Sequence, residues 1–273
     1  MEFLECKPRY ELNMDNYQTI QTGYDGSVAT LWLSRPEVHN ALNGKMIQEI
    51  AAFFKQIEGN DDLRVVVIKG SGESFCSGAD LQWMKNAFAL SNEENLRESE
   101  ALAQMFSAIF YSSKVVIAIA HGNIFGGGIG LLAVCDLAYG ISSASFCLSE
   151  TRIGMAAATI TPYLLQKMNS PTLKELIFTA KKFDGDEARE YGILNRSFPT
   201  IETAEAYIKE VLTQIVANGK RAIVASKQLI NQLSQETSLE TMEQIPGLLT
   251  RIRVSSEAQE GFSAFLEKRK PVW

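Results

Sequence analysis

The stretch 115–150 constrains this chain more than any other part of the sequence. It begins with an apolar run rich in Val and Ile, passes through the glycine cluster Gly126-Gly127-Gly128, and ends at a single carboxylate, Glu150. A buried strand that runs through glycines into a helix exposes backbone N–H groups at the positive end of that helix. We therefore expect a group that is negative, or becomes negative during a reaction, to bind there.

Hydrophobic periodicity divides the chain near residue 200. Before it, short strands rich in Val and Ile alternate with amphipathic helices, beginning with an antiparallel pair at 17–22 and 28–33 around Asp25-Gly26. The pattern from 201 to 273 is helical. Together they predict an α/β fold with a core at 17–200 and a helical C-terminal region. Residues 1–16 are expected to form a loosely ordered leader.

Composition narrows the class of protein. A formal net charge of −6 gives no general attraction for nucleic acid or anionic lipid. The sequence lacks a run of about 18 apolar residues, which is roughly what a membrane-spanning helix needs. Its cysteines have no metal-ligand spacing: Cys6, Cys76, Cys135 and Cys147. We expect a cytoplasmic protein without a nucleic-acid or membrane partner, a metal or a separate cofactor.

Three interpretations compete for the glycine cluster. A phosphate-binding loop requires a lysine and a hydroxyl residue that do not follow Gly128. A dinucleotide fingerprint fits poorly, because the cluster has extra glycines and no acidic residue closes a second strand at the expected distance. Tight packing of a helix on a strand is the structural alternative.

A second glycine turn decides between them. Ser77-Gly78-Ala79-Asp80 also follows a buried strand and leads directly into a helical segment. Two N–H groups from two separate turns are what an oxyanion hole for a thioester or ester carbonyl requires.

The motifs around both turns resemble those of the crotonase superfamily, the enoyl-CoA hydratases and isomerases. They are SFCSGADLQWM, AHGNIFGGGIGLLAVCDLAYG and FCLSETRIG, supported by SRPEVHNALN, DGDEAREYGILN and GFSAFLEKRKPVW, and the whole match covers roughly 17–273. The resemblance implies a spiral of ββα turns with a helical trimerisation region, assembled as a homotrimer or a dimer of trimers. It also implies an acyl-CoA substrate, with coenzyme A as part of the substrate.

The same resemblance assigns roles to residues of this chain. The oxyanion hole falls on the N–H groups of Ala79 and Gly127, and Glu150 is the catalytic acid/base. Substrate-binding positions are expected at Gly78, Asp80, Gly126, Gly130, Arg152 and Ala158. Of these, Gly78, Ala79 and Asp80 border the adenine and pantetheine of CoA, and the N–H of Ala158 holds water.

Gly130 departs from the pattern of the two-acid hydratases, which carry their first catalytic glutamate there. Losing a general base of this kind removes a contribution of about 10²–10⁴-fold. A lone acid suits isomerisation, decarboxylation or substrate-assisted hydration.

Closer motifs narrow the substrate. GGGxGLxAxCD and FCLSExRIGxxxATIxPY resemble bacterial 3-methylglutaconyl-CoA hydratases, whose branched substrates carry a second, free carboxylate. We therefore expect a hydro-lyase acting on a 3-methylglutaconyl-CoA-like substrate. A single-acid isomerase or decarboxylase is the alternative, and a non-catalytic acyl-CoA-binding or RNA-binding relative is an alternative of another class.

Overall fold

The computed structural model describes residues 17–235 and 238–273, so the expected leader at 1–16 lies outside the described residues. The chain forms two compact units, one ending at Ala206 and the other covering Tyr207–Trp273. Helix α8 (Ile201–Ala217) contains the division between them.

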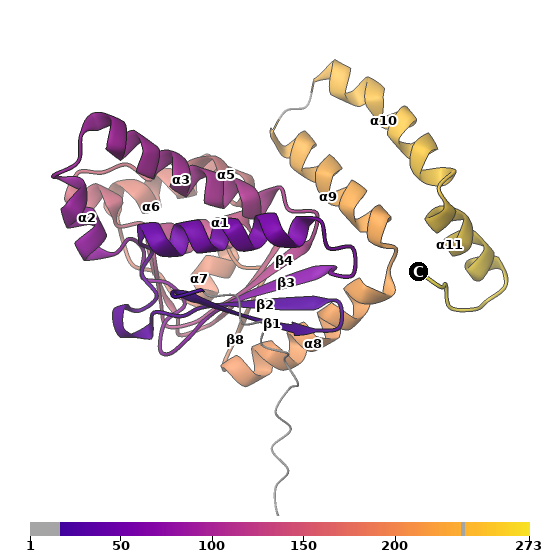
Figure 1. The fold of residues 1–273 in the computed structure, drawn as a ribbon, viewed down its shortest axis with the longest axis horizontal. Helices are drawn as coiled ribbons and strands as arrows, with labels where there is room; N and C mark the ends of the chain where they lie inside the picture. Colours follow the sequence, from indigo (N-terminus) through magenta and orange to yellow (C-terminus); the bar gives the residue numbers. More distant parts are fainter. Residues whose placement is uncertain (1–16, 236–237) are drawn as a thin grey trace, which may run out of the picture. The chain divides into compact units, whose positions relative to one another are not determined.

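The first unit is built on a six-stranded sheet in the order β1-β2-β3-β4-β6-β8 (Figure 1). The β1–β2 pair is antiparallel, and every other pair of neighbours is parallel. Strands inside a parallel sheet are covered on both faces, which explains the continuous Val and Ile runs of the central strands. The strands are β1 (Ile20–Asp25), β2 (Val28–Leu33), β3 (Val65–Gly70), β4 (Val115–Ala120), β6 (Leu137–Ile141) and β8 (Arg196–Phe198).

Strand β1 begins three residues later than the sequence pattern predicted. The carboxylate of Glu49 accepts the backbone N–H groups of Gln18 and Thr19, at 2.9 and 2.8 Å. These donors bind a side chain instead of a neighbouring strand. The hairpin at Asp25-Gly26 is confirmed, with Ile20 opposite Leu33 and Asp25 opposite Val28.

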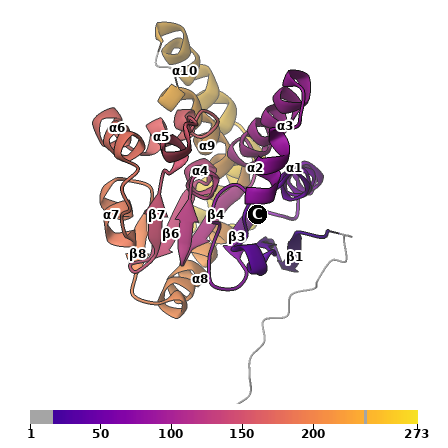
Figure 2. The same ribbon diagram turned by 90° about the vertical axis from the view of Figure 1, so that its left-hand side faces the viewer.

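A smaller sheet turns the chain into a spiral. It pairs β5 (Asn123–Phe125) with β7 (Ser145–Cys147), and parallel bridge Cys76–Ile124 and antiparallel bridge Phe146–Phe183 extend it. Each turn of the spiral has a strand of the large sheet, a segment of the small sheet and a helix. β4, β5 and α4 (Gly127–Val134) form one such turn, with α4 over β4 and β6 (Figure 2). The predicted spiral of ββα turns is therefore confirmed.

The helices of the first unit cover the sheet, and side chains cap several of them. Asn43 accepts the N–H of Met46 at 2.9 Å, and Ser91 and Glu94 form a complete capping box. Helices α1 and α3 pack side by side (Figure 1). The helices are α1 (Gly44–Glu58), α2 (Leu81–Ala87), α3 (Asn92–Phe110), α5 (Thr161–Lys167), α6 (Ser170–Thr179) and α7 (Gly185–Glu190), with short 3₁₀ helices η1 (Pro36–Val38) and η2 (Glu150–Ile153).

The second unit contains α9 (Lys220–Gln235), α10 (Leu239–Arg253) and α11 (Ser256–Leu266). Its helices bury little: none of the residues described in α9 is buried, and only Ala264 is buried in α11. Trp273 fastens the chain end by donating its indole N–H to the carbonyl of Ala217 at 2.7 Å. The helical character predicted for 201–273 is confirmed, whereas its role in trimerisation stays a prediction.

Candidate active site

The first glycine turn, 76–80, is held against the segment before α1. Leu42 donates its N–H to the carbonyl of Gly78 at 2.7 Å and accepts the N–H of Asp80 at 2.8 Å. Gly78 has φ +98°, and a Cβ added there would lie 3.0 Å from the carbonyl oxygen of Phe125. Both facts require glycine. The N–H of Ala79, between the two paired groups, has no acceptor in the described chain.

Two residues of the early SRPEVHNALN motif brace this turn. Arg35 forms an ion pair with Asp80 at 2.7 Å and donates to the carbonyl of Ala41 at 2.6 Å. The side-chain amide of Asn40 donates to the carbonyls of Ser71 and Ser74. The sequence motif indicated the family but not this role, because the partners lie 31 to 45 residues away.

Asp80 has a structural contact for each of its carboxylate oxygens. One oxygen accepts the N–H groups of Gln82 and Trp83 and caps α2, and the other binds Arg35. Burial raises the pKa of Asp80, but the hydrogen bonds from Arg35 and the two backbone N–H groups outweigh burial and lower the pKa overall. Asp80 therefore orients the turn as an anion, and its predicted contact with CoA stays a prediction.

The second glycine turn lies against the first. Gly126 has φ +46°, and its N–H binds the carbonyl of Cys147 at 3.0 Å. A Cβ on Gly128 would lie 2.2 Å from the carbonyl oxygen of Cys76, and one on Gly127 would lie 3.1 Å from Leu42. These close approaches explain the consecutive glycines. The N–H of Gly127 begins α4 and has no acceptor in the part of the chain that is described.

Leu42 thus links the two free N–H groups, since it pairs with Ala79 and touches the position of Gly127. The fold brings together two donors that are separated by 48 positions in the sequence and that need an acceptor from outside the described chain. Two such donors are the groups from which an oxyanion hole is built.

Glu150 faces the same turn. Its Oε1 lies 2.9 Å from where a Cβ on Gly126 would stand, so a side chain at position 126 would displace the carboxylate. Its Oε2 is buried and has no hydrogen-bond partner among the described residues. Burial raises the pKa of Glu150 above its ordinary value, and the hydrogen bond with its own backbone offsets only part of that effect. A carboxyl group with a raised pKa can both take and return a proton.

Gly130 is enclosed by apolar side chains. A Cβ there would lie 2.2 Å from Cγ2 of Ile160 and 3.0 Å from Cζ of Phe106, and both of these residues are buried. The space of a first catalytic glutamate is therefore occupied by hydrocarbon. Sequence reasoning found the missing carboxylate but did not assign this packing to Phe106, which lies in no motif, or to Ile160, which lies in the motif FCLSExRIGxxxATIxPY.

Two other predicted residues lie around Glu150. Ala158 is exposed before α5, and its N–H has no acceptor in the described residues, as a water-holding donor would require. Arg152 donates to the carbonyl of Ala180, just after α6. That contact gives Arg152 a structural partner, and its role in substrate binding stays a prediction.

Three further residues, Cys76, His39 and His121, have structural surroundings. Burial raises the pKa of the Cys76 thiol to about 12, which leaves it uncharged and a poor nucleophile. His39 and His121 bind Ser74 and the carbonyl of Gly72, at 3.2 and 2.9 Å. Within 17–235 and 238–273, no three His, Cys, Asp or Glu residues gather as a metal site. None of the described helices is long and apolar enough to cross a membrane.

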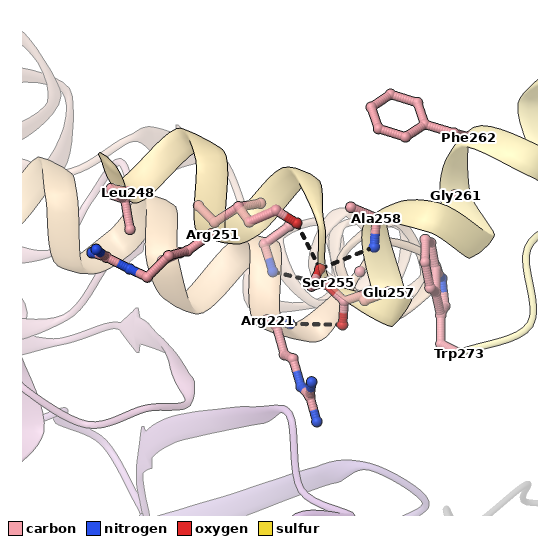
Figure 3. A pocket seen from close by; sticks show the side chains of 13 residues that line it. Arg221, Leu248, Arg251, Ser255, Glu257, Ala258, Gly261, Phe262 and Trp273 are labelled. Atoms are coloured by element: carbon pink, nitrogen blue, oxygen red, sulfur yellow. Dashed lines mark hydrogen bonds between the residues drawn. The ribbon is translucent and has the colours of Figure 1, made fainter. Parts of the chain in front are cut away.

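A separate cavity of about 540 Å³ lies within the second unit among α9, α10, α11 and the chain end (Figure 3). Leu248, Ile252, Phe262 and Trp273 give it apolar walls, and Arg221 and Arg251 also line it. None of the predicted catalytic or substrate-binding residues lines it.

Comparison with known proteins settles the family. The family model described as enoyl-CoA hydratase/isomerase matches residues 23–273. The chain belongs to this family. This protein is therefore an enzyme of the enoyl-CoA hydratase/isomerase class. An acyl-CoA substrate is consistent with that family.

Some relatives of this family member are named hydratases and others isomerases. The crotonyl-CoA hydratase of Syntrophomonas wolfei is 30% identical over 257 residues, which is 93% of this chain and 97% of the relative. The peroxisomal Delta(3,5)-Delta(2,4)-dienoyl-CoA isomerase of Arabidopsis thaliana is 28% identical over 277 residues, 95% of this chain and 98% of the relative. The solved structure of an enoyl-CoA hydratase from Shewanella pealeana is 31% identical with a TM-score of 0.90, covering 94% of this chain and 96% of that one.

Proposed function

We propose that this family member is a hydro-lyase that adds water to, or removes it from, the 2,3 double bond of an enoyl-CoA. One observation carries the proposal: the carboxyl of Glu150, with its raised pKa, stands beside the turn that presents the free N–H of Gly127. Ala79 supplies the second N–H from the adjoining turn. The thioester oxygen binds to these two donors, and Glu150 exchanges protons with the substrate and with water.

In the hydration direction, the carboxylate of Glu150 takes a proton from water as the water oxygen bonds to Cβ. The electron pair of the double bond moves toward the thioester, and the N–H groups of Ala79 and Gly127 stabilise the resulting enolate oxygen. Glu150 then returns its proton to Cα, which completes the addition of one water molecule. The N–H of Ala158 orients that water.

For the substrate we propose a 3-methylglutaconyl-CoA-like thioester. The motifs that include Gly130 and Arg152 support this choice, because they resemble hydratases of such branched, carboxylated substrates. CoA borders the turn of Gly78 and Asp80, whose backbone is fixed by Leu42 and Arg35.

Isomerisation of an enoyl-CoA is a second candidate, and the packing at Gly130 favours it. Ile160 and Phe106 occupy the space where a second acid would stand. One carboxylate is enough to remove a proton from one carbon and return it to another, or to protonate the enolate left by a decarboxylation.

Offering three thioesters to the protein tests the proposal. Crotonyl-CoA, 3-methylglutaconyl-CoA and a 3-enoyl-CoA are incubated with the protein, and the absorbance of the conjugated thioester is followed. Loss of absorbance with 3-methylglutaconyl-CoA is expected. A gain of absorbance with the 3-enoyl-CoA as the sole activity would replace the hydro-lyase by an isomerase.

A further inference from the structure

A lysine beside the candidate active site has no role in the proposed chemistry. Lys182 is exposed, and its Nζ lies over the ring of Phe125, 5.6 Å from the ring centroid. It forms no ion pair or hydrogen bond within the described residues. A free ammonium group at this position is a candidate for recognising an anion.

Phe125 places this cation at the edge of the two glycine turns. Its Cβ lies 3.8 Å, and its carbonyl oxygen 3.0 Å, from where a Cβ on Gly78 would stand. The chain continues from Phe125 directly into Gly126, against which the carboxylate of Glu150 rests. Lys182 therefore lies next to the segment that joins both oxyanion donors to the acid/base.

The neighbouring Lys181 has different contacts. It forms an ion pair with Glu175 at 2.7 Å and lies over the ring of Tyr191, 5.6 Å from its centroid. The charge of Lys181 is thus matched by a carboxylate, whereas that of Lys182 is not. The two adjacent lysines therefore differ in their ion pairing, in the ring that they cover and in their exposure, which is greater for Lys182.

A second cation reinforces Lys182. Arg152 donates to the carbonyl of Ala180, two residues before Lys182, and the thiol of Cys147 contacts the same carbonyl at 3.1 Å. The charges of Arg152, Glu150 and Lys182 all act on that thiol. Arg152 thus has a backbone partner, whereas Lys182 has no carboxylate partner among the described residues, so the charge of Lys182 is available for a group that arrives with the substrate.

We propose that Lys182, with Arg152 beside it, binds a free carboxylate on the acyl part of the substrate and so selects dicarboxylic enoyl-CoA thioesters. This inference rests on the proposed function, because it takes the thioester to lie between Ala79 and Gly127. A carboxylate one methylene beyond Cβ, as in 3-methylglutaconyl-CoA, needs a cation close to the reacting carbons. The phosphates of CoA are the other anion that a lysine could bind.

Binding of two saturated thioesters separates recognition from turnover. Glutaryl-CoA carries the free carboxylate and butyryl-CoA does not, and neither has a double bond to react. Calorimetry should show that Lys182→Gln weakens glutaryl-CoA binding by about tenfold or more, the usual effect of losing a hydrogen bond to a charged group, and leaves butyryl-CoA unchanged. Lys182→Arg should retain most of the preference, and Lys181→Gln, the matched control, should retain all of it.

Two other binding results would overturn the inference. Equal weakening of both CoA esters, absent for the corresponding pantetheine thioesters, would assign Lys182 to the CoA phosphates. Unchanged binding of both esters would show that Lys182 only packs over the ring of Phe125 and binds no part of the substrate. A failure of the proposed function has a separate signature: no turnover of any enoyl-CoA while the preference for glutaryl-CoA still depends on Lys182. Equal unfolding midpoints of the variants and the parent protein verify that all are folded.

Discussion

Glu150 is the residue on which the proposed chemistry depends most. Glu150→Gln keeps the size of the side chain but cannot accept a proton, so turnover should fall by about 10²–10⁴-fold. CoA affinity should persist, because the turns that hold the thioester do not use the carboxylate. Single-turnover rates and calorimetry with butyryl-CoA measure the two effects. Undiminished turnover would remove Glu150 from the mechanism.

The raised pKa of Glu150 also predicts how stability depends on pH. The folded protein binds the proton of Glu150 more tightly than the unfolded chain, so this group makes stability fall as pH rises from its ordinary pKa through its folded pKa. Glu150→Gln should therefore raise the unfolding midpoint at neutral pH. The gain should vanish at pH below the ordinary carboxyl pKa. Thermal unfolding over a pH series checks this, and a gain that is independent of pH would contradict it.

Gly130 provides a second test at the residue scale. Gly130→Glu would place a Cβ 2.2 Å from Ile160, and the overpacking should cost about 1–3 kcal/mol of unfolding free energy. Adding Ile160→Ala should recover part of that loss by opening space. Urea unfolding of the single and double variants gives both values. Equal stability of Gly130→Glu and the parent protein would contradict this prediction, because it would mean that α4 can shift away from Ile160 without cost.

Among the structural elements, the 76–80 turn depends on a residue far away in the sequence, because Arg35 pairs with Asp80. Arg35→Met should cost about 1–3 kcal/mol by leaving the carboxylate of Asp80 without its partner. Turnover should fall as well, since the N–H of Ala79 loses its fixed direction. Lys69→Gln, which breaks an exposed pair with Glu205, is the control and should cost at most about 1 kcal/mol. Urea unfolding and kcat measure the outcome, and equal effects of both variants would contradict a special role for Arg35.

The sequence predicted elements better than contacts. Hydrophobic periodicity located the strand at 28–33, the strand that begins at Val115 and the change to helices near residue 200, because periodicity depends on near neighbours in the chain. The resemblance placed Ala79, Gly127 and Glu150, and the fold brings their segments together. Neither periodicity nor the resemblance indicated three contacts. Glu49 binds the backbone before β1, Arg35 pairs with Asp80, and Lys182 lies over the ring of Phe125. Each of these depends on partners that only the folded chain brings together.

At the scale of the whole molecule, the exposed apolar surface of the second unit leads us to expect that several copies of the chain associate. Its helices bury few of their own residues, and large apolar side chains stay exposed: Phe262, Phe265, Leu266 and Val272. We expect the protein in solution to have three or six times the mass of one chain, because such surface is covered in stable proteins. Light scattering measures this mass. A stable monomer at micromolar concentration would contradict the trimer or dimer of trimers.

The packing of Ile160 against Gly130 has a consequence for how such a protein can change over generations. A chain of this kind could gain a second carboxylate at position 130 only after the side chain at 160 had become smaller, since the reverse order passes through a destabilised intermediate. A chain that once had the glutamate and lost it would be held in the one-acid state as soon as a branched residue filled the space. A large residue at position 160 therefore opposes the return of a glutamate at position 130. Positions 130 and 160 should be compared together when one-acid and two-acid relatives are aligned.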